Sequence, residues 1–221
     1  MSTTIVIQCA ADKDGGYLRS SDGHYVGFVA QPRIAPSRLG WVFARPDDVA
    51  PIGGTWRAVL AAYNERFMRS GDNPDDLKAA WNLYTNRAYR NLTQSFGTDS
   101  LYILSAGWGL VHACYLLPNY DITFRNQADP VAIRRRGDLF HDARQMPDDV
   151  GGPVLFLGGL SYLRMFCTLT SDVRAERIVY YNSSRQPDVR GCRLIRYQTN
   201  TRTNWHYECA ADLASGRLVV R

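Results

Sequence analysis

Lysine is nearly absent from this chain of 221 residues. Lys13 and Lys78 are the only two lysines, so 24 of the 26 basic side chains are arginine. Two interpretations stay open: the bias of a GC-rich source genome, and phosphate contact, because the planar guanidinium fork binds phosphate in a bidentate geometry. The net charge of +5 permits nucleic-acid binding without establishing it.

Disulfide, zinc and membrane signals are also lacking. The five cysteines are odd in number, widely spaced and free of any Cys-x-x-Cys pair, which argues against a disulfide framework and a structural zinc site. We do not expect the segment MSTTIVIQCA to act as a signal peptide, because it lacks a basic stretch followed by a long apolar one. No apolar run approaches the roughly 20 residues of a membrane span. We expect a cytoplasmic protein with no metal, no cofactor, no membrane contact and no obligate protein partner.

Common catalytic signatures are missing as well. The sequence contains no HExxH, P-loop, GxGxxG or nucleophile-elbow motif. The four histidines, His24, His112, His141 and His206, show no metal-binding spacing. A site must therefore be located from the order of the structural elements.

The hydrophobic share of 45% and the aromatic share of 12% are typical of a folded globular chain. Apolar, β-branched runs predict buried strands at 3–9, 101–106, 153–159 and 177–181. Capping residues and apolar periodicity predict helices at 56–70, between Thr55 and Gly71, at about 73–96, ending at Gly97, and at 160–170. This order predicts an α/β fold: three layers, α/β/α, around a mainly parallel four-stranded sheet.

We expect a single domain over 1–221, with two departures from the regular α/β order. Residues 10–54 form a long irregular insertion with short strand-like pieces, and such loops are often functional. Residues of about 190–221 alternate and turn as a C-terminal β-hairpin would.

Ligands of open parallel sheets bind outside the carboxyl ends of the strands. Three predicted strand ends combine small residues with polar or aromatic ones: 8–13, 105–109 and 158–162. Backbone amides after Gly159 are candidates to hold an anion. Purely structural alternatives stay open for these residues. Gly158–Gly159 can form a tight turn, Cys9 can be a buried core residue, and Trp108 can cover the end of the sheet. Lys13 is either a solvated loop residue or a phosphate contact or reactive amine.

Asp121 is the strongest catalytic candidate. It follows Asn119 and Tyr120 soon after the second strand end, where a carboxylate held beside an aromatic ring can orient water or stabilise positive charge. The alternative is a turn aspartate that bonds its own backbone. The run Arg134–Arg136 is either a DNA-facing patch or an ordinary solvated run.

Three segments carry a resemblance. IVIQCAADK resembles the opening strand and Cys-Ser-x-x-Lys-like turn of the YaaA-like and archaeosine-synthase-associated domains; YILSAGWGLV followed by LPNYDITF resembles their ILSAKYGL…PYD signature; FLGGLSYLRMF resembles a later glycine-plus-tyrosine element. The matches span about residues 3 to 166, with long unmatched insertions. These families are related in fold to uracil-DNA glycosylases. The chain departs from those enzymes: it has no Gly-Gln-Asp-Pro-Tyr or His-Pro-Ser motif, and Asp12 is only a loose counterpart of their aspartate.

The resemblance implies a DNA glycosylase that flips a modified pyrimidine out of double-stranded phage DNA, with glucosylated hydroxymethylcytosine as the expected base and anti-phage defence as the role. The implied catalytic residues are Asp121, Asp12 and Lys13, and the implied DNA contacts are His24, Arg134, Arg135 and Arg136. The implied base-binding residues are Gln8, Cys9, Ala10, Ser105, Trp108, Asn119, Tyr120, Gly159 and Tyr162. Two alternatives stay open: a non-catalytic DNA-binding stress protein and a tRNA base-modification enzyme of the deazaguanine pathway.

Overall fold

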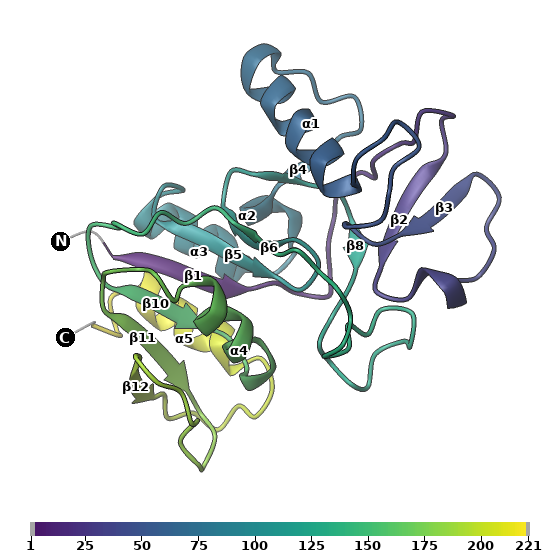
Figure 1. Cartoon of the computed structure of the whole chain (residues 1–221). Helices are drawn as coiled ribbons and strands as arrows, with labels where there is room; N and C mark the ends of the chain where they lie inside the picture. The colour runs from purple at the N-terminus through teal and green to yellow at the C-terminus, as the bar shows by residue number, and fades with distance from the viewer. Residues whose placement is uncertain (1–2, 220–221) are drawn as a thin grey trace.

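The computed structural model describes residues 3–219 and is built on a seven-stranded mixed sheet, in the order β12-β11-β10-β1-β5-β6-β9 (Figure 1). Five neighbouring strands run parallel: β12 (Arg193–Arg196), β11 (Arg177–Tyr181), β10 (Val154–Leu157), β1 (Thr4–Gln8) and β5 (Leu101–Ser105). β6 (Gly109–His112) returns antiparallel to β5, and the short β9 (Ala143–Arg144) pairs parallel with β6. The four strands expected from the sequence are confirmed, and three others extend the sheet.

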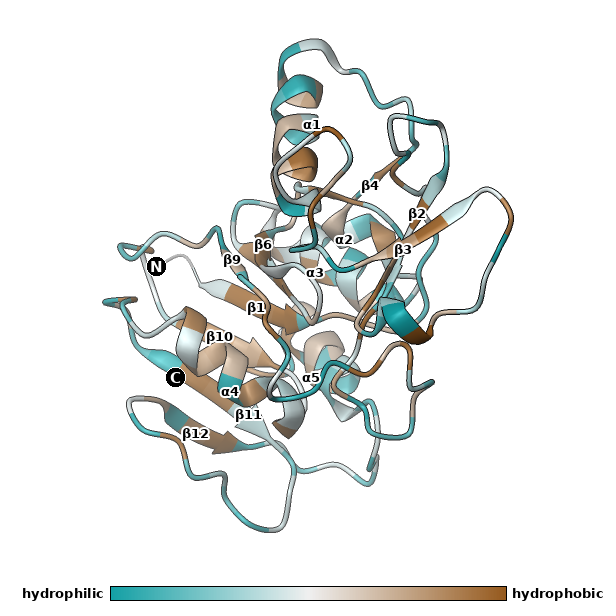
Figure 2. Ribbon diagram, turned by 45° about the vertical axis from the view of Figure 1, so that its right-hand side comes forward, coloured by the Kyte–Doolittle hydropathy of each residue, from teal (hydrophilic) through white to brown (hydrophobic). Residues whose placement is uncertain are grey.

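Helices cover both faces of this sheet. α4 (Leu160–Leu169) lies on one face, whereas α3 (Arg87–Phe96) and α5 (Trp205–Ala214) pack against each other on the other face (Figures 1 and 2). The central strands are therefore buried on both sides, which explains why they read as continuous apolar runs and colour brown in Figure 2. Their carboxyl ends are left uncovered by this packing.

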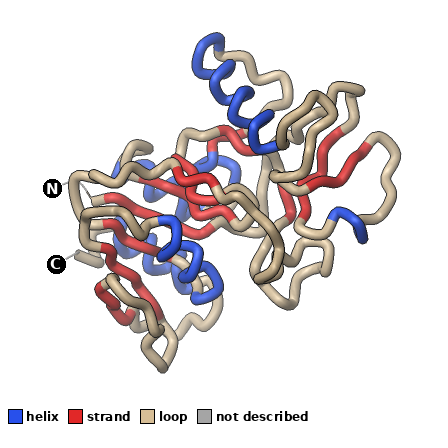
Figure 3. The backbone as a smooth tube through the Cα atoms, in the orientation of Figure 1, coloured by secondary structure: helices blue, strands red, loops and turns tan. Residues whose placement is uncertain are grey.

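The segment expected as a long insertion builds a second, smaller sheet. β2 (Tyr25–Val29), which lies between β3 (Trp41–Ala44) and β8 (Tyr120–Asp121), pairs parallel with both strands. The rest of the segment is loop with one 3-10 turn (η1, Pro32–Ile34), as Figure 3 shows. Because β8 belongs to the loop after β6, this sheet fixes the position of Asp121.

One helix prediction is confirmed to the residue. α1 spans Trp56–Ser70; the Thr55 side chain accepts a hydrogen bond from the backbone N–H of Ala58, and Gly71 ends the helix with a left-handed φ of 74°. Thr55 and Gly71 can be recognised in the sequence because capping depends on residues next to the helix end.

The helix expected over 73–96 is broken, and that prediction is wrong in part. Asn73 bonds the Leu77 backbone, Asp76 takes a left-handed φ of 49°, and β4 (Lys78–Ala79) pairs with β7 (Leu116–Leu117). Only the short α2 (Ala80–Leu83) precedes α3, which Asn86 caps and Gly97 ends. Local side-chain caps and strand pairing, rather than the apolar periodicity, decide the backbone here.

The predicted C-terminal β-hairpin is wrong. β12 joins the main sheet as its parallel edge strand, and the following segment is the helix α5. The buried positions of α5 recur at three and four residues, at Trp205, Cys209, Ala210 and Leu213, which is a helical period. This correction matters for the site, because it brings the first turn of α5 to the carboxyl ends of the strands.

Gly109 makes the tight return from β5 to β6 possible. Its φ is 93°, and a Cβ there would lie 2.3 Å from the backbone N and O atoms of Ala143 on β9. We expect Gly109→Ala to lower the free energy of unfolding by roughly 1–3 kcal/mol beyond the cost of backbone strain. The matched control is Gly53→Ala, at φ 88° with nothing within 4 Å, which isolates that strain. Equal losses for both variants in urea denaturation would contradict the role of β9.

Candidate functional site

A pocket of about 420 Å³ opens at the carboxyl ends of β1 and β10. Its walls come from four places: the end of β1, the segment around β8, the start of α4 and the start of α5. Seven residues expected from the sequence line it: Gln8, Cys9, Ala10, Lys13, Asp121, Gly159 and Tyr162. Asp121 therefore belongs to the pocket wall, and its side chain is exposed there rather than closing a turn.

Buried hydroxyl groups lie behind the wall of the pocket, and of these only that of Tyr162 belongs to a residue that lines it. The Tyr162 hydroxyl and the Cys9 thiol lie 3.2 Å apart. Ser105 Oγ donates to the Tyr120 hydroxyl at 2.8 Å, and the Tyr120 hydroxyl lies 2.7 Å from that of Tyr84. Burial raises the pKa of Tyr84, Tyr120 and Tyr162 well above the ordinary phenol value. These groups stay neutral at physiological pH. Ser105 and Tyr120 support the wall from behind and do not line it, contrary to their expected contact with a base.

Gln8 ties the end of β1 to the start of α4. Its side-chain oxygen accepts the backbone N–H of Gly159 at 2.6 Å. A Cβ on Gly158 would lie 2.5 Å from the Phe156 ring, so this glycine serves close packing at the strand-to-helix turn. The turn interpretation is therefore correct for Gly158, while Gly159 faces the pocket.

Lys13 lies in the pocket wall with an unusual set of neighbours. Its Nζ donates to the backbone carbonyl of Ala11 at 3.1 Å and lies 4.2 Å from the centre of the Tyr120 ring. Burial lowers the pKa of the Lys13 ammonium, although the charges of Cys9 and Asp121 act in the opposite sense. Lys13 is partly exposed and lines the pocket, so it is not a fully solvated loop residue.

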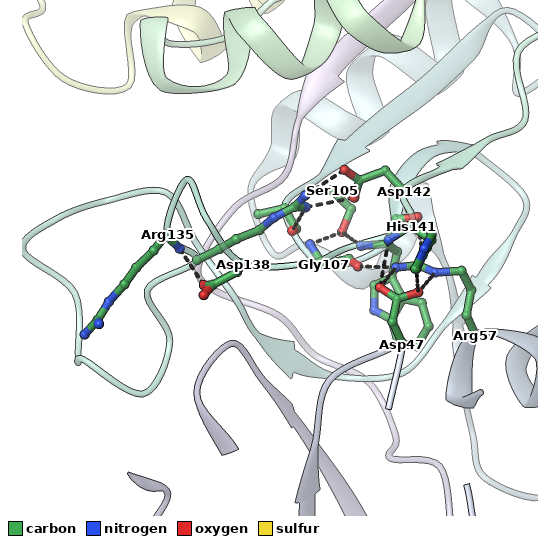
Figure 4. Close-up of polar contacts among 11 residues, drawn as sticks. Asp47, Arg57, Ser105, Gly107, Arg135, Asp138, His141 and Asp142 are labelled. Atoms are coloured by element: carbon green, nitrogen blue, oxygen red, sulfur yellow. Dashed lines mark hydrogen bonds and ion pairs between the residues drawn. The ribbon is translucent and has the colours of Figure 1, made fainter. Parts of the chain in front are cut away.

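Trp108 does not enter the pocket, and its predicted role as a stacking platform is wrong. It is 1% exposed and packs edge-on against Phe28. The turn that carries it is held from outside by Arg57, which donates to the carbonyl groups of Gly107 and Trp108 at 3.1 and 2.9 Å (Figure 4). The aromatic turn is thus a fixed part of the core.

Asp47 neutralises that arginine. It accepts two hydrogen bonds from Arg57, at 2.8 and 3.0 Å, and one from the backbone N–H of His141, as Figure 4 shows. Burial alone would raise the pKa of the Asp47 carboxyl, but Arg57 brings it below its ordinary value. The pair is ionised and rigid, as a partly buried charge requires.

The run Arg134–Arg136 does not act as one DNA-facing patch. Arg134 donates to both carboxylate oxygens of Asp142, at 2.8 and 2.7 Å, and to the carbonyl of Ala106 at 2.7 Å. Its side chain is 11% exposed, so it braces the turn and is not free for phosphate. Arg135 and Arg136 are exposed, and Figure 4 shows Arg135 pointing away from this brace.

Three other expected residues lie outside the pocket lining. Asp12 is exposed beside it and accepts the Thr85 backbone N–H through its carbonyl. Asn119 donates its backbone N–H to Gly16. His24 forms a pair with Asp22 at the turn before β2. Of the two predicted catalytic aspartates, only Asp121 has access to a ligand in the pocket.

The start of α5 supplies residues that the sequence interpretation missed. His206 is 3% exposed and lines the pocket, yet among residues 3–219 its buried Nε2 makes no hydrogen bond. Burial lowers the pKa of His206 to about 4, so the ring is neutral at physiological pH. Tyr207 lines the pocket beside it, and the exposed Arg125 and Arg202 form a basic rim. A helical periodicity from Trp205 was the available signal.

The arrangement combines a carboxylate, an amine, a neutral imidazole and neutral hydroxyls around one cavity.

Within residues 3–219 there is no cluster of three or more His, Cys, Asp or Glu side chains suited to a metal ion, and no helix there is long and apolar enough to cross a membrane. Comparisons with family models, curated proteins and solved structures found no match. The chemistry of the pocket is therefore the basis for any assignment of function.

The buried, neutral state of His206 lowers the free energy of unfolding at acidic pH. Unfolding restores the ordinary pKa of 6.5, so stability is full above pH 6.5 and falls as the pH drops towards about 4. Since one pKa unit corresponds to about 1.4 kcal/mol, the loss amounts to roughly 3 kcal/mol. We expect His206→Gln to remove most of this slope in urea denaturation between pH 7.5 and 4.5, with His141→Gln at the exposed surface as the control. An unchanged slope in His206→Gln would contradict the buried neutral state.

Proposed function

We propose that the protein is a DNA glycosylase that excises a modified pyrimidine from double-stranded DNA and leaves an abasic site. The observation that carries this proposal is the exposed Asp121 carboxylate in the wall of a strand-end pocket that it shares with the neutral Tyr162 and His206. A carboxylate in such a place stabilises the positive charge that develops on the deoxyribose when the bond to the base breaks, and it orients the attacking water.

The basic rim supports binding of the phosphate backbone. Arg125 and Arg202 flank the opening, and the bidentate guanidinium suits phosphate oxygens. A base inside a duplex cannot reach a pocket of this depth, so the target nucleotide is flipped out of the helix. Tyr207, which is partly exposed and lines the pocket, offers aromatic surface to the flipped base in place of Trp108.

Neutral polar groups support departure of the base. As the C1′–N bond breaks, its electron pair stays on the base, where a hydrogen-bond donor stabilises it. His206 lines the pocket, its buried Nε2 makes no hydrogen bond within residues 3–219, and its ring is neutral at physiological pH, so we assign it this role. Asp12 lies outside the lining, so we assign the carboxylate role to Asp121 alone.

The fold is consistent with the resemblance to the uracil-DNA-glycosylase superfamily. Parallel strands lie between helices on two faces, and the pocket opens where those enzymes bind a base. A volume of about 420 Å³ has room for a base that carries a sugar, so we propose glucosylated hydroxymethylcytosine of phage DNA as the target and anti-phage defence as the role. A DNA-binding stress protein would need the rim without the carboxylate, and a tRNA-modifying enzyme would select RNA.

The test is mass spectrometry of free base released from glucosylated phage DNA, beside ordinary DNA and tRNA. We expect release from the glucosylated DNA, with abasic sites left behind. Asp121→Asn should slow release at least roughly a hundredfold, because the amide cannot supply the negative charge. The matched control is Asp149→Asn, an exposed loop carboxylate outside the pocket, which should act as wild type.

Three results would separate the alternatives. Salt-dependent DNA binding that survives Asp121→Asn, with no base released by wild type, would favour a non-catalytic DNA-binding protein. Activity on tRNA alone would favour the base-modification alternative. Equal release by wild type and Asp121→Asn would remove the carboxylate from the mechanism.

A further inference from the structure

The two lysines of the chain differ in their surroundings. Lys78 lies 2.8 Å from the Asp76 carboxylate, in an exposed ion pair. Among the described residues no carboxylate lies within ion-pair distance of Lys13, whose Nζ contacts a backbone carbonyl and the Tyr120 ring instead. A carboxylate contact holds the proton of an ammonium group, so Lys13 is the lysine that more readily becomes a free amine.

Lys13 also faces the space that a ligand would fill. It lines the same pocket as Asp121, and the two charges are close enough to interact electrostatically. An amine and a carboxylate in one partly desolvated pocket are the parts needed for imine chemistry: a nucleophile for a carbonyl carbon and a group that accepts a proton. Burial of the ammonium, described above, acts in the same direction.

We propose that Lys13 forms an imine with the aldehyde of an abasic site in this pocket, and that the protein thereby cleaves the DNA strand after the base has left. This inference rests on the proposed glycosylase function, because that reaction generates the abasic site. It adds a second activity, a lyase, to base excision.

The step balances without any further reagent. The lone pair of neutral Lys13 Nζ attacks C1′ of the open-chain sugar and forms a C–N bond. One proton moves from nitrogen to the former aldehyde oxygen, a second comes from solvent, and the oxygen leaves as water, so that an N-protonated iminium remains. The positive iminium acidifies C2′, and Asp121 accepts the C2′ proton. The electrons of that C–H bond form a C2′–C3′ double bond, and the C3′–O bond breaks with its electron pair on oxygen, which releases the downstream strand with a 5′ phosphate. Water then hydrolyses the imine and restores Lys13.

The competing role for Lys13 is a simple phosphate contact. Arginine would keep or strengthen such a contact, whereas a guanidinium cannot form this imine. Lys13→Arg therefore separates the two roles while it preserves charge. Lys78→Arg is the matched control, since it changes the only other lysine, which lies outside the pocket lining.

The experiment supplies the abasic site preformed, so it does not depend on base release. Full-length protein is incubated with duplex DNA that carries one natural abasic site, in the presence of sodium cyanoborohydride, which reduces the iminium to a stable secondary amine. Duplex DNA with a tetrahydrofuran analogue, which has no aldehyde, is the substrate control. Denaturing gels measure crosslinked protein and strand cleavage, and peptide mass spectrometry locates the adduct. Thermal melting of each variant checks folding.

We expect wild type and Lys78→Arg to crosslink to the natural abasic site at Lys13, and Lys13→Arg to lose at least roughly 90% of the adduct while it still binds abasic DNA. No adduct in wild type, an adduct at another amine, or an adduct that persists in Lys13→Arg would overturn the proposal. Base release without trapping at Lys13 would overturn the lyase step and leave the glycosylase function intact. Trapping at Lys13 without base release from modified DNA would do the reverse.

Discussion

Two paired arginines fix the turn after β5, and the geometry of the site depends on them. Arg57 and Arg134 donate to three successive carbonyl groups, those of Ala106, Gly107 and Trp108, from opposite parts of the chain. Each arginine is held in turn by an aspartate, Asp47 or Asp142. A partly buried guanidinium is tolerable only when it is paired and its donors are satisfied, so these contacts form one coupled arrangement.

This arrangement joins α1 and the turn after β5 to the segment after β8, which contributes part of the pocket wall. Arg57 belongs to α1 and Asp47 to the loop before it, whereas Arg134 and Asp142 belong to the long segment that follows β8. The turn in the middle carries Ser105, whose Oγ accepts the backbone N–H groups of Gly107 and Trp108 and reaches the Tyr120 hydroxyl. The position of Tyr120, and with it that of Asp121, is thus coupled to the end of the central sheet.

The electrostatic character of the pocket follows from unequal burial. The tyrosine hydroxyls and His206 are deep and stay neutral, while Asp121 and the arginines of the rim reach solvent. Lys13, which is partly exposed, lies between these two zones. A gradient from a charged rim to a neutral back suits a ligand with a phosphate backbone outside and an uncharged base inside.

Elements with local sequence signals are predictable from the chain alone. The β-branched runs predict the central strands, and the capping residues predict α1. The rule that ligands bind at the carboxyl ends of parallel strands predicts the position of the pocket. The side chains that line the pocket, in contrast, follow from long-range packing. Trp108 packs in the core against Phe28, and Arg134 pairs with Asp142. His206 belongs to α5, in a segment for which the sequence predicts a strand. The physical reason is that burial and pairing of a side chain depend on partners distant in sequence, which no local pattern records.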